Sequence, residues 1–191
     1  MGREPTLLSY RPGWLDAAAA SVLEVCLRQQ VVWRQESLSL YGRRVQVPRL
    51  VAWCGDAGVN YRYAGADHVC DGWLLPLLQL RGRLEAELGL RCNLVLLNRY
   101  RDGSDYMGWH TDDERGHERC IASVSLGATR RFLVRPEGAE RAGAGPSVPF
   151  DLQHGSLLLM DGSIRHSLPK TRRPVAERIN LTYRSITAEA R

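Results

Sequence analysis

The spacing of apolar and polar positions changes along the chain, from a helical period in the first part to a strand period in the second. Residues 16–27 contain an alanine run with larger apolar residues, and Asp16 stands where a helix N-cap is expected. Residues 71–88 carry an apolar stripe, and Gly89 can end this second helix. The stripe consists of Leu74, Leu77, Leu78, Leu84 and Leu88. The pattern therefore predicts two helices before residue 90, with a strand-rich stretch between them.

After Gly89 the pattern becomes one of short strands separated by Gly, Asp and Pro clusters. Strands are predicted over 92–100, 121–126, 130–134, 155–160 and 178–186, with a hairpin loop over 137–147. Turns are predicted at Tyr41-Gly42 and at Asp56-Ala57-Gly58. Many short strands after a helical part predict a mainly β (α+β) class. The expected architecture is a jelly roll, or double-stranded β-helix, with the N-terminal helices packed outside.

The length and net charge of the chain bear on its domain organisation and on its partners. A chain of 191 residues is expected to form one compact domain, with residues 1–90 as an N-terminal extension and 91–191 as the jelly-roll core. The net charge is +5, and Lys170 is the only lysine among 26 basic residues. GC-rich codon usage accounts for the ratio of arginine to lysine, whereas the positive charge permits a nucleic-acid partner.

The chain shows no sign of export or membrane insertion. No apolar run approaches the roughly 20 residues of a membrane span, and residues 1–5 do not lead into a signal-peptide core. Five cysteines without a C-x-x-C pair are expected to be reduced thiols, and they support neither disulfides nor a thiolate zinc site. We therefore expect a cytoplasmic protein that has no membrane partner and is a monomer.

His110, Asp112 and His166 are the residues that most strongly suggest chemistry. On an extended segment, positions 110 and 112 place their side chains on one face, and His166 must come from another strand. Two imidazoles and a carboxylate can hold iron(II) and leave its other positions open. Each histidine alone is more often an ordinary imidazole, which is our interpretation of His68, His117 and His154.

A second polar set lies near the C-terminus. Arg178, Asn180, Thr182 and Arg184 alternate with Ile179, Leu181, Tyr183 and Ser185, so the polar residues share one face of a strand. Asn98 and Tyr100 have the same spacing. A half-exposed edge strand would also give this pattern. Otherwise the polar face must line a cavity or find partners.

Taken together, these motifs resemble the AlkB family of Fe(II)/2-oxoglutarate dioxygenases. The resemblance covers about residues 47–186 and rests on the stretches 98–103, 110–114, 123–128, 154–157, 166–169 and 178–184. Residues 47–49 and 56–58 place the chain nearer the subgroup that repairs alkylated DNA, which includes the double-strand-active animal homologue.

The resemblance implies roles for individual residues. His110, Asp112 and His166 match the iron ligands, and Arg178 and Arg184 match the arginines that hold the two carboxylates of 2-oxoglutarate. Asn98, Tyr100 and Asn180 match supporting polar contacts. The residues implied to contact substrate are Tyr61 and Tyr63 beside a flipped base, Asp113 near the base edge, Tyr41 at a hairpin tip that wedges into the duplex, and Arg49. The first 90 residues would then include a nucleotide-recognition lid.

The implied activity is oxidative demethylation of 1-methyladenine and 3-methylcytosine in alkylated DNA. It would use Fe(II), 2-oxoglutarate and O2, and release formaldehyde, succinate and CO2. Three alternatives remain: an oxygenase acting on RNA bases or a protein side chain, a non-catalytic nucleic-acid-binding jelly roll, and a zinc hydrolase. A binding module predicts a broken triad or clamp, and a zinc hydrolase does not explain Arg178 and Arg184.

Overall fold

The computed structural model of the chain describes residues 7–40, 42–63, 66–70, 72–112, 120–135 and 146–186. Its two helices are α1 (Ala17–Gln30) and α2 (Leu75–Leu88). Its strands are β1 (Leu8–Arg11), β2 (Ser37–Leu40), β3 (Arg43–Gln46), β4 (Leu50–Gly55), β5 (Asn60–Tyr63), β6 (Ala66–Val69), β7 (Leu94–Tyr100), β8 (Met107–His110), β9 (Cys120–Gly127), β10 (Arg130–Arg135), β11 (Val148–Leu152), β12 (Ser156–Asp161), β13 (Arg165–Leu168) and β14 (Arg178–Arg184).

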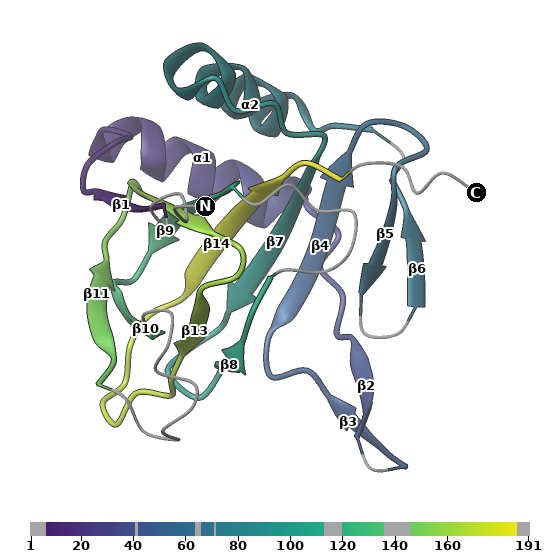
Figure 1. Cartoon of the computed structure of the whole chain (residues 1–191), viewed down its shortest axis with the longest axis vertical. Helices are drawn as coiled ribbons and strands as arrows, with labels where there is room; N and C mark the ends of the chain where they lie inside the picture. The colour runs from purple at the N-terminus through teal and green to yellow at the C-terminus, as the bar shows by residue number, and fades with distance from the viewer. Residues whose placement is uncertain are drawn as a thin grey trace, which may run out of the picture.

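Two antiparallel sheets form the body of the molecule. The larger has the strand order β1-β12-β9-β14-β7-β4, and the smaller has the order β11-β10-β13-β8. Non-consecutive strands are neighbours in both sheets, as a double-stranded β-helix requires. Figure 1 shows the smaller sheet in front of the larger one. The prediction of a mainly β fold with two sheets and two helices is confirmed.

The helices pack on the outer face of the larger sheet, as predicted (Figure 1). Asp16 caps α1 by accepting a hydrogen bond from the backbone N–H of Ala19 at 2.8 Å, and Gly89 ends α2 in the left-handed conformation. The prediction of the apolar stripe of α2 is partly wrong, because Leu78 is 42% exposed and Leu80, which was not predicted, is buried. Helix α2 also begins later than predicted, at Leu75, with a proline in its first turn.

Strand β14 lies between β9 and β7 in the larger sheet, and all seven of its residues are buried. The interpretation of residues 178–184 as a half-exposed edge strand is therefore wrong. Ile179, Leu181 and Tyr183 face the helices in the main hydrophobic core. The alternate residues must then point into the space between the two sheets.

Two further hairpins extend from the body beside β4, namely β2–β3 and β5–β6 (Figure 1). Gly42 and Gly58 adopt φ values of +74° and +84° at the predicted turns. The predicted loop over 137–147 lies almost entirely outside the described residues. No helix in the described part of the chain is long and apolar enough to cross a membrane.

Candidate metal and co-substrate site

His110, Asp112 and His166 come together at one end of the space between the sheets. His110 and His166 are direct partners across the β8–β13 pair, and their ring centroids are 4.1 Å apart. Asp112 lies just beyond β8, and its carboxylate oxygens are 3.7 Å from His110 Nε2 and 3.6 Å from His166 Nε2. One candidate ligand atom from each residue lies within 4.8 Å of the other two. The predicted triad is thus assembled in space.

Backbone carbonyls orient both imidazoles. His110 Nδ1 is 2.9 Å from the carbonyl oxygen of Gly108, and His166 Nδ1 is 2.8 Å from that of Ile164. When Nδ1 donates to a carbonyl, the lone pair of Nε2 is available to a metal. Burial lowers the pKa of His166 to about 4, so this imidazole is neutral at physiological pH.

Asp112 is held by its backbone and by a buried arginine. Its N–H donates to the carbonyl of Gly162 at 2.8 Å, and a Cβ at position 162 would lie only 2.8 Å from the carbonyl oxygen of Asp112. Arg184 contacts the Asp112 carboxylate at 2.9 Å. Burial alone would raise the pKa of Asp112, but the nearby positive charge of Arg184 contributes most among the interactions that outweigh it and lower that pKa. Asp112 therefore remains an anionic ligand.

Arg178 lies further along the same polar face and is only 2% exposed. It donates to the Ser125 hydroxyl at 2.9 Å, and its guanidinium carbon is 5.4 Å from the ring centroid of Tyr100. Its Nε has no hydrogen-bond partner among the described residues. Burial lowers the pKa of Arg178 to about 10, so the side chain keeps its charge at neutral pH. A buried cation with an open donor fits a carboxylate ligand.

The supporting polar residues are fixed by hydrogen bonds. Asn180 donates to the Ser123 hydroxyl at 2.8 Å and to the carbonyl of Val124 at 3.1 Å. Asn98 accepts from Arg49 Nε at 2.7 Å. The residues that line the pocket include the predicted Asn98, Tyr100, His110, Asp112, His166, Arg178, Asn180, Thr182 and Arg184, together with Ser123 and Phe132, for which the sequence had suggested no role. Ser123 and Ser125 could have been found, because they alternate along a strand as the C-terminal set does.

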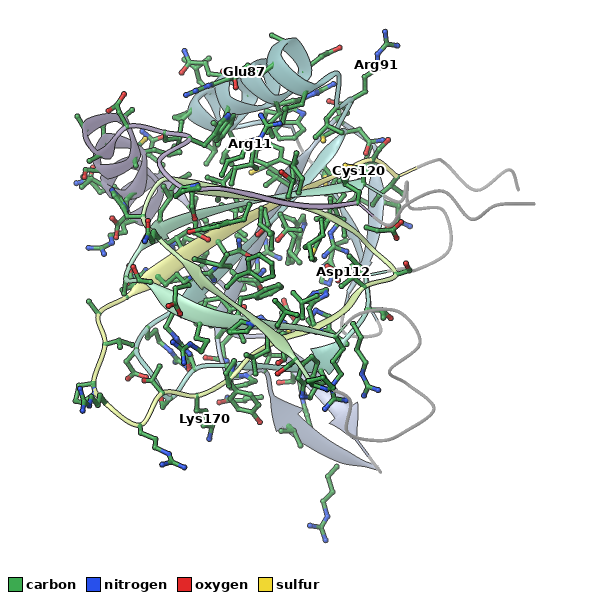
Figure 2. The ribbon with its side chains drawn as sticks, turned by 60° about the vertical axis from the view of Figure 1, so that its left-hand side comes forward. Arg11, Glu87, Arg91, Asp112, Cys120 and Lys170 are labelled. Atoms are coloured by element: carbon green, nitrogen blue, oxygen red, sulfur yellow. The ribbon has the colours of Figure 1, made fainter. Side chains whose placement is uncertain are left out.

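The candidate substrate residues are placed less completely. Tyr61 and Tyr63 belong to β5, and Tyr41 and Asp113 lie outside the described residues. Arg49, which the resemblance implies to contact substrate, is only 4% exposed. Arg43 and Arg44 are exposed on β3. Asp112 is 9% exposed, and Figure 2 shows it at mid-height between Arg91 near the top and Lys170 near the bottom.

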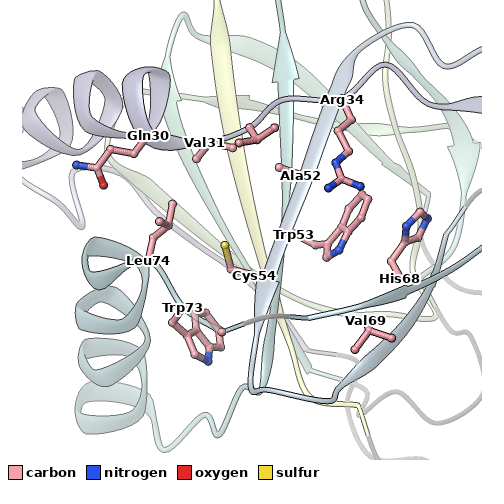
Figure 3. A pocket seen from close by; sticks show the side chains of 12 residues that line it. Gln30, Val31, Arg34, Ala52, Trp53, Cys54, His68, Val69, Trp73 and Leu74 are labelled. Carbon is pink, nitrogen blue, oxygen red and sulfur yellow. The ribbon is translucent and has the colours of Figure 1, made fainter.

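A second pocket lies at the outer edge of β4, lined in part by Arg34, Trp53, His68 and Trp73 (Figure 3). Arg34 lies over the Trp53 ring at 5.1 Å, and His68 contacts the same ring at 4.0 Å between centroids. None of the triad residues lines this pocket. His154, also interpreted as an ordinary imidazole, accepts a hydrogen bond from the Gly127 N–H through Nδ1 at 2.8 Å.

The residues of the first pocket fit the pair of cofactors that the sequence predicted. Two imidazoles and one carboxylate are the donor set of non-haem iron(II) oxygenases, and one ligand atom from each residue lies within 4.8 Å of the other two. Arg178 supplies a cation with an open donor for a carboxylate of 2-oxoglutarate. A thiolate site is not formed there, because no cysteine is among the residues that line the pocket.

Comparison of the sequence with known proteins indicates the same class of site. The profile of the family described as "2OG-Fe(II) oxygenase superfamily" matches residues 8–184. The DNA oxidative demethylase ALKBH2 of Homo sapiens is 39% identical over 160 residues, which are 78% of this chain and 60% of that protein. The ALKBH2 of Mus musculus is 38% identical, over 84% of this chain and 72% of that protein. The human alpha-ketoglutarate-dependent dioxygenase alkB homolog 3 is 35% identical, over 94% of this chain and 66% of that protein.

Solved structures show the same fold at much lower identity. A 2OG-Fe(II) oxygenase family oxidoreductase from Burkholderia pseudomallei has a TM-score of 0.64 and 16% identity, over 96% of this chain and 88% of that one. A prolyl hydroxylase from Trichoplax adhaerens has a TM-score of 0.64 and 14% identity, over 94% and 83%. The chain spans about 60% of the length of the human ALKBH2 that it matches. By its profile match and its relatives, the chain belongs to the 2OG-Fe(II) oxygenase superfamily and, within it, to the AlkB family.

Proposed function

We propose that this protein is an Fe(II)/2-oxoglutarate-dependent dioxygenase that demethylates alkylated bases of nucleic acids, with 1-methyladenine and 3-methylcytosine in DNA as substrates. The observation that carries the proposal is the meeting of His110, Asp112 and His166 with the open donor of buried Arg178 in one pocket. The nucleic-acid substrate is supported by the relatives named DNA oxidative demethylase.

In this proposal, one set of pocket residues binds the metal and another set binds the co-substrate. His110 and His166 present Nε2, and Asp112 presents its carboxylate, so that these three would hold the iron. Arg178 would hold one carboxylate of 2-oxoglutarate. Arg184 contacts the carboxylate of Asp112, and from there it would help to hold the second carboxylate of 2-oxoglutarate. When bound, Fe(II) with 2-oxoglutarate and O2 supplies oxidation of an N-methyl group, which leaves as formaldehyde while succinate and CO2 form.

The methylated base must leave the base stack to reach this pocket, which costs a few kcal/mol for a paired base. In the proposal, Tyr61 and Tyr63 on β5 contact the flipped base, Asp113 lies near its edge, and Tyr41 fills the gap left in the duplex. The β5–β6 hairpin would form part of a nucleotide-recognition lid. Buried Arg49 would act on substrate indirectly, because it donates to Asn98 in the pocket.

The test is an assay of methylated oligonucleotides with Fe(II) and 2-oxoglutarate, scored by the loss of one methyl group in the mass spectrum. We expect demethylation in air, none without oxygen, and none in the variant His166→Ala. The variant His154→Ala is the matched control, because His154 lies outside the pocket. Methylated DNA and RNA of the same sequence are compared in parallel. If neither the DNA nor the RNA oligonucleotide loses a methyl group although the protein binds metal and 2-oxoglutarate, the assignment of a nucleic-acid substrate is wrong.

A further inference from the structure

Arg130 is a fully buried arginine on β10 that does not line the pocket. It is 1% exposed, and its guanidinium donates to three backbone carbonyls. NH1 donates to Asp102 at 2.9 Å, while NH2 donates to Asp105 at 2.9 Å and to Pro169 at 2.8 Å. A guanidinium has its donors in one plane, so only an arginine can make this fork to two separate loops.

The two loops that Arg130 joins flank the strands that carry the histidine ligands. The 102–105 loop leads into β8, which ends at His110, and Pro169 follows β13, which holds His166. Strands β8 and β13 pair with each other, and their register shifts between His166 and Leu168. An irregular pair of short strands is weakly specified on its own. Arg130 therefore braces the end of this pair where the two loops meet.

The loops are packed closely enough to transmit such a constraint. The Thr171 N–H donates to the carbonyl of Gly103 at 2.9 Å. A Cβ at position 103 would lie 1.8 Å from the Thr171 hydroxyl, so the loops can approach this closely only with glycine there. Movement of the 102–105 loop would thus shift both β8 and the segment after β13.

Arg130 also brings a second positive charge to the co-substrate end of the pocket. Its guanidinium carbon is 5.8 Å from the ring centroid of Tyr100, and that of Arg178 is 5.4 Å from the same centroid. The carboxylate of Asp105 is already engaged by the backbone N–H, Nε and NH2 of Arg101. Two buried cations therefore lie close to the Tyr100 ring, and their combined field favours an anion beside Arg178.

We propose that Arg130 is a positioning residue that couples the two halves of the site. Its hydrogen bonds hold β8 against β13 so that His110 faces His166, and its charge strengthens binding of the 2-oxoglutarate carboxylate at Arg178. The inference rests on the proposed metal and co-substrate site, but it is independent of which base is demethylated.

The experiment uses Arg130→Lys, which keeps the charge but loses the fork, and Arg130→Met, which loses both. Arg131→Met is the matched control, because the neighbouring Arg131 is exposed and contacts Asp151. Calorimetry measures Mn(II) binding, and then 2-oxoglutarate binding with Mn(II) saturating. We expect both Arg130 variants to bind Mn(II) about tenfold more weakly. At saturating Mn(II), Arg130→Lys should bind 2-oxoglutarate within about threefold of wild type, and Arg130→Met about tenfold more weakly or worse.

A merely structural role would make the two variants lose 2-oxoglutarate affinity equally, and this result overturns the charge effect. Unchanged Mn(II) affinity in Arg130→Lys overturns the bracing of the ligands. If Arg130→Met does not fold, as its thermal unfolding would show, Arg130→Lys decides alone: weaker Mn(II) binding with near-normal 2-oxoglutarate binding supports the proposal, and any other combination overturns it. Wild-type protein that binds neither ligand would instead refute the proposed site.

Discussion

At the scale of single residues, the candidate site consists of charged groups in an interior where water cannot compensate for missing partners. Arg184 has the Asp112 carboxylate at 2.9 Å, whereas Arg178 has a hydroxyl, an aromatic ring and an open Nε. A buried donor without a partner costs about 1–3 kcal/mol. An incoming carboxylate can recover that cost, so Arg178 is predisposed to bind an anion.

We expect Arg178→Lys to raise the concentration of 2-oxoglutarate needed for half-maximal activity by about tenfold or more. Lysine keeps the charge, but it cannot form the bidentate pair that a guanidinium makes with a carboxylate. A charge-assisted hydrogen bond contributes about 1.5–3 kcal/mol, and each 1.4 kcal/mol corresponds to a factor of ten. Steady-state kinetics over a range of 2-oxoglutarate concentrations measures the effect.

The control is Arg172→Lys, the same change at an exposed residue in the loop before β14. It should leave the 2-oxoglutarate requirement unchanged. An unaltered requirement in Arg178→Lys, with normal turnover, would place the carboxylate site elsewhere.

At the scale of secondary-structure elements, the sequence predicted which residues share a face better than it predicted what that face meets. Alternation placed Arg178, Asn180 and Arg184 together, and the strand does extend over them. It could not show whether this face was exposed, because that depends on β9 and β7 pairing on either side. The spacing predicted only that His166 comes from another strand than His110. The resemblance to a family identified the two residues as ligands of one metal ion, and they are partners across β8 and β13.

Other details depend on tertiary contacts that local sequence does not contain. Leu78 and Leu80 both fit a leucine-rich helix, and only packing against the sheet decides that Leu80 is buried. The role of Gly162 was missed, since a glycine after a strand usually indicates a turn. Here its lack of a side chain allows the backbone of Asp112 to approach. Arg130 was missed because its partners are backbone carbonyls of loops distant in sequence.

The β2–β3 hairpin carries the exposed arginines that we expect to bind phosphates. The double variant Arg43→Gln/Arg44→Gln should weaken binding of duplex DNA and flatten its dependence on salt. For each phosphate that the variant no longer neutralises, the slope of log affinity against log salt should become shallower by about 0.9. Fluorescence anisotropy of labelled duplex at several salt concentrations measures both quantities.

Arg91→Gln is the control, because Arg91 is also exposed but lies beyond α2, away from the hairpin (Figure 2). It should change neither affinity nor slope. A double variant with the slope of wild type would show that the hairpin does not bind the phosphate backbone.

At the scale of the whole molecule, the interior has an excess of positive charge. Among the residues that the structure describes, four arginines are buried (Arg49, Arg130, Arg178 and Arg184), against three buried aspartates (Asp105, Asp112 and Asp161). Such groups are costly to remove from water unless partners surround them. A divalent cation held by the triad adds to this excess, whereas the two carboxylates of 2-oxoglutarate reduce it. The two ligands should therefore bind cooperatively, and together they should stabilise the fold.

We expect the protein with saturating Mn(II), an oxygen-inert substitute for Fe(II), to unfold at a clearly higher temperature when 2-oxoglutarate is added. A ligand at about 100 times its dissociation constant stabilises the native state by about 2.7 kcal/mol. For a chain of about 150–250 residues each kcal/mol shifts the midpoint by about 2–4 °C, so the expected rise is roughly 5–10 °C. Dimethyl 2-oxoglutarate, which lacks both charges, should give almost no shift, and Arg178→Lys should reduce the shift given by the diacid. If the diacid and its ester stabilise the protein equally, the excess of buried arginine does not serve to bind an anion.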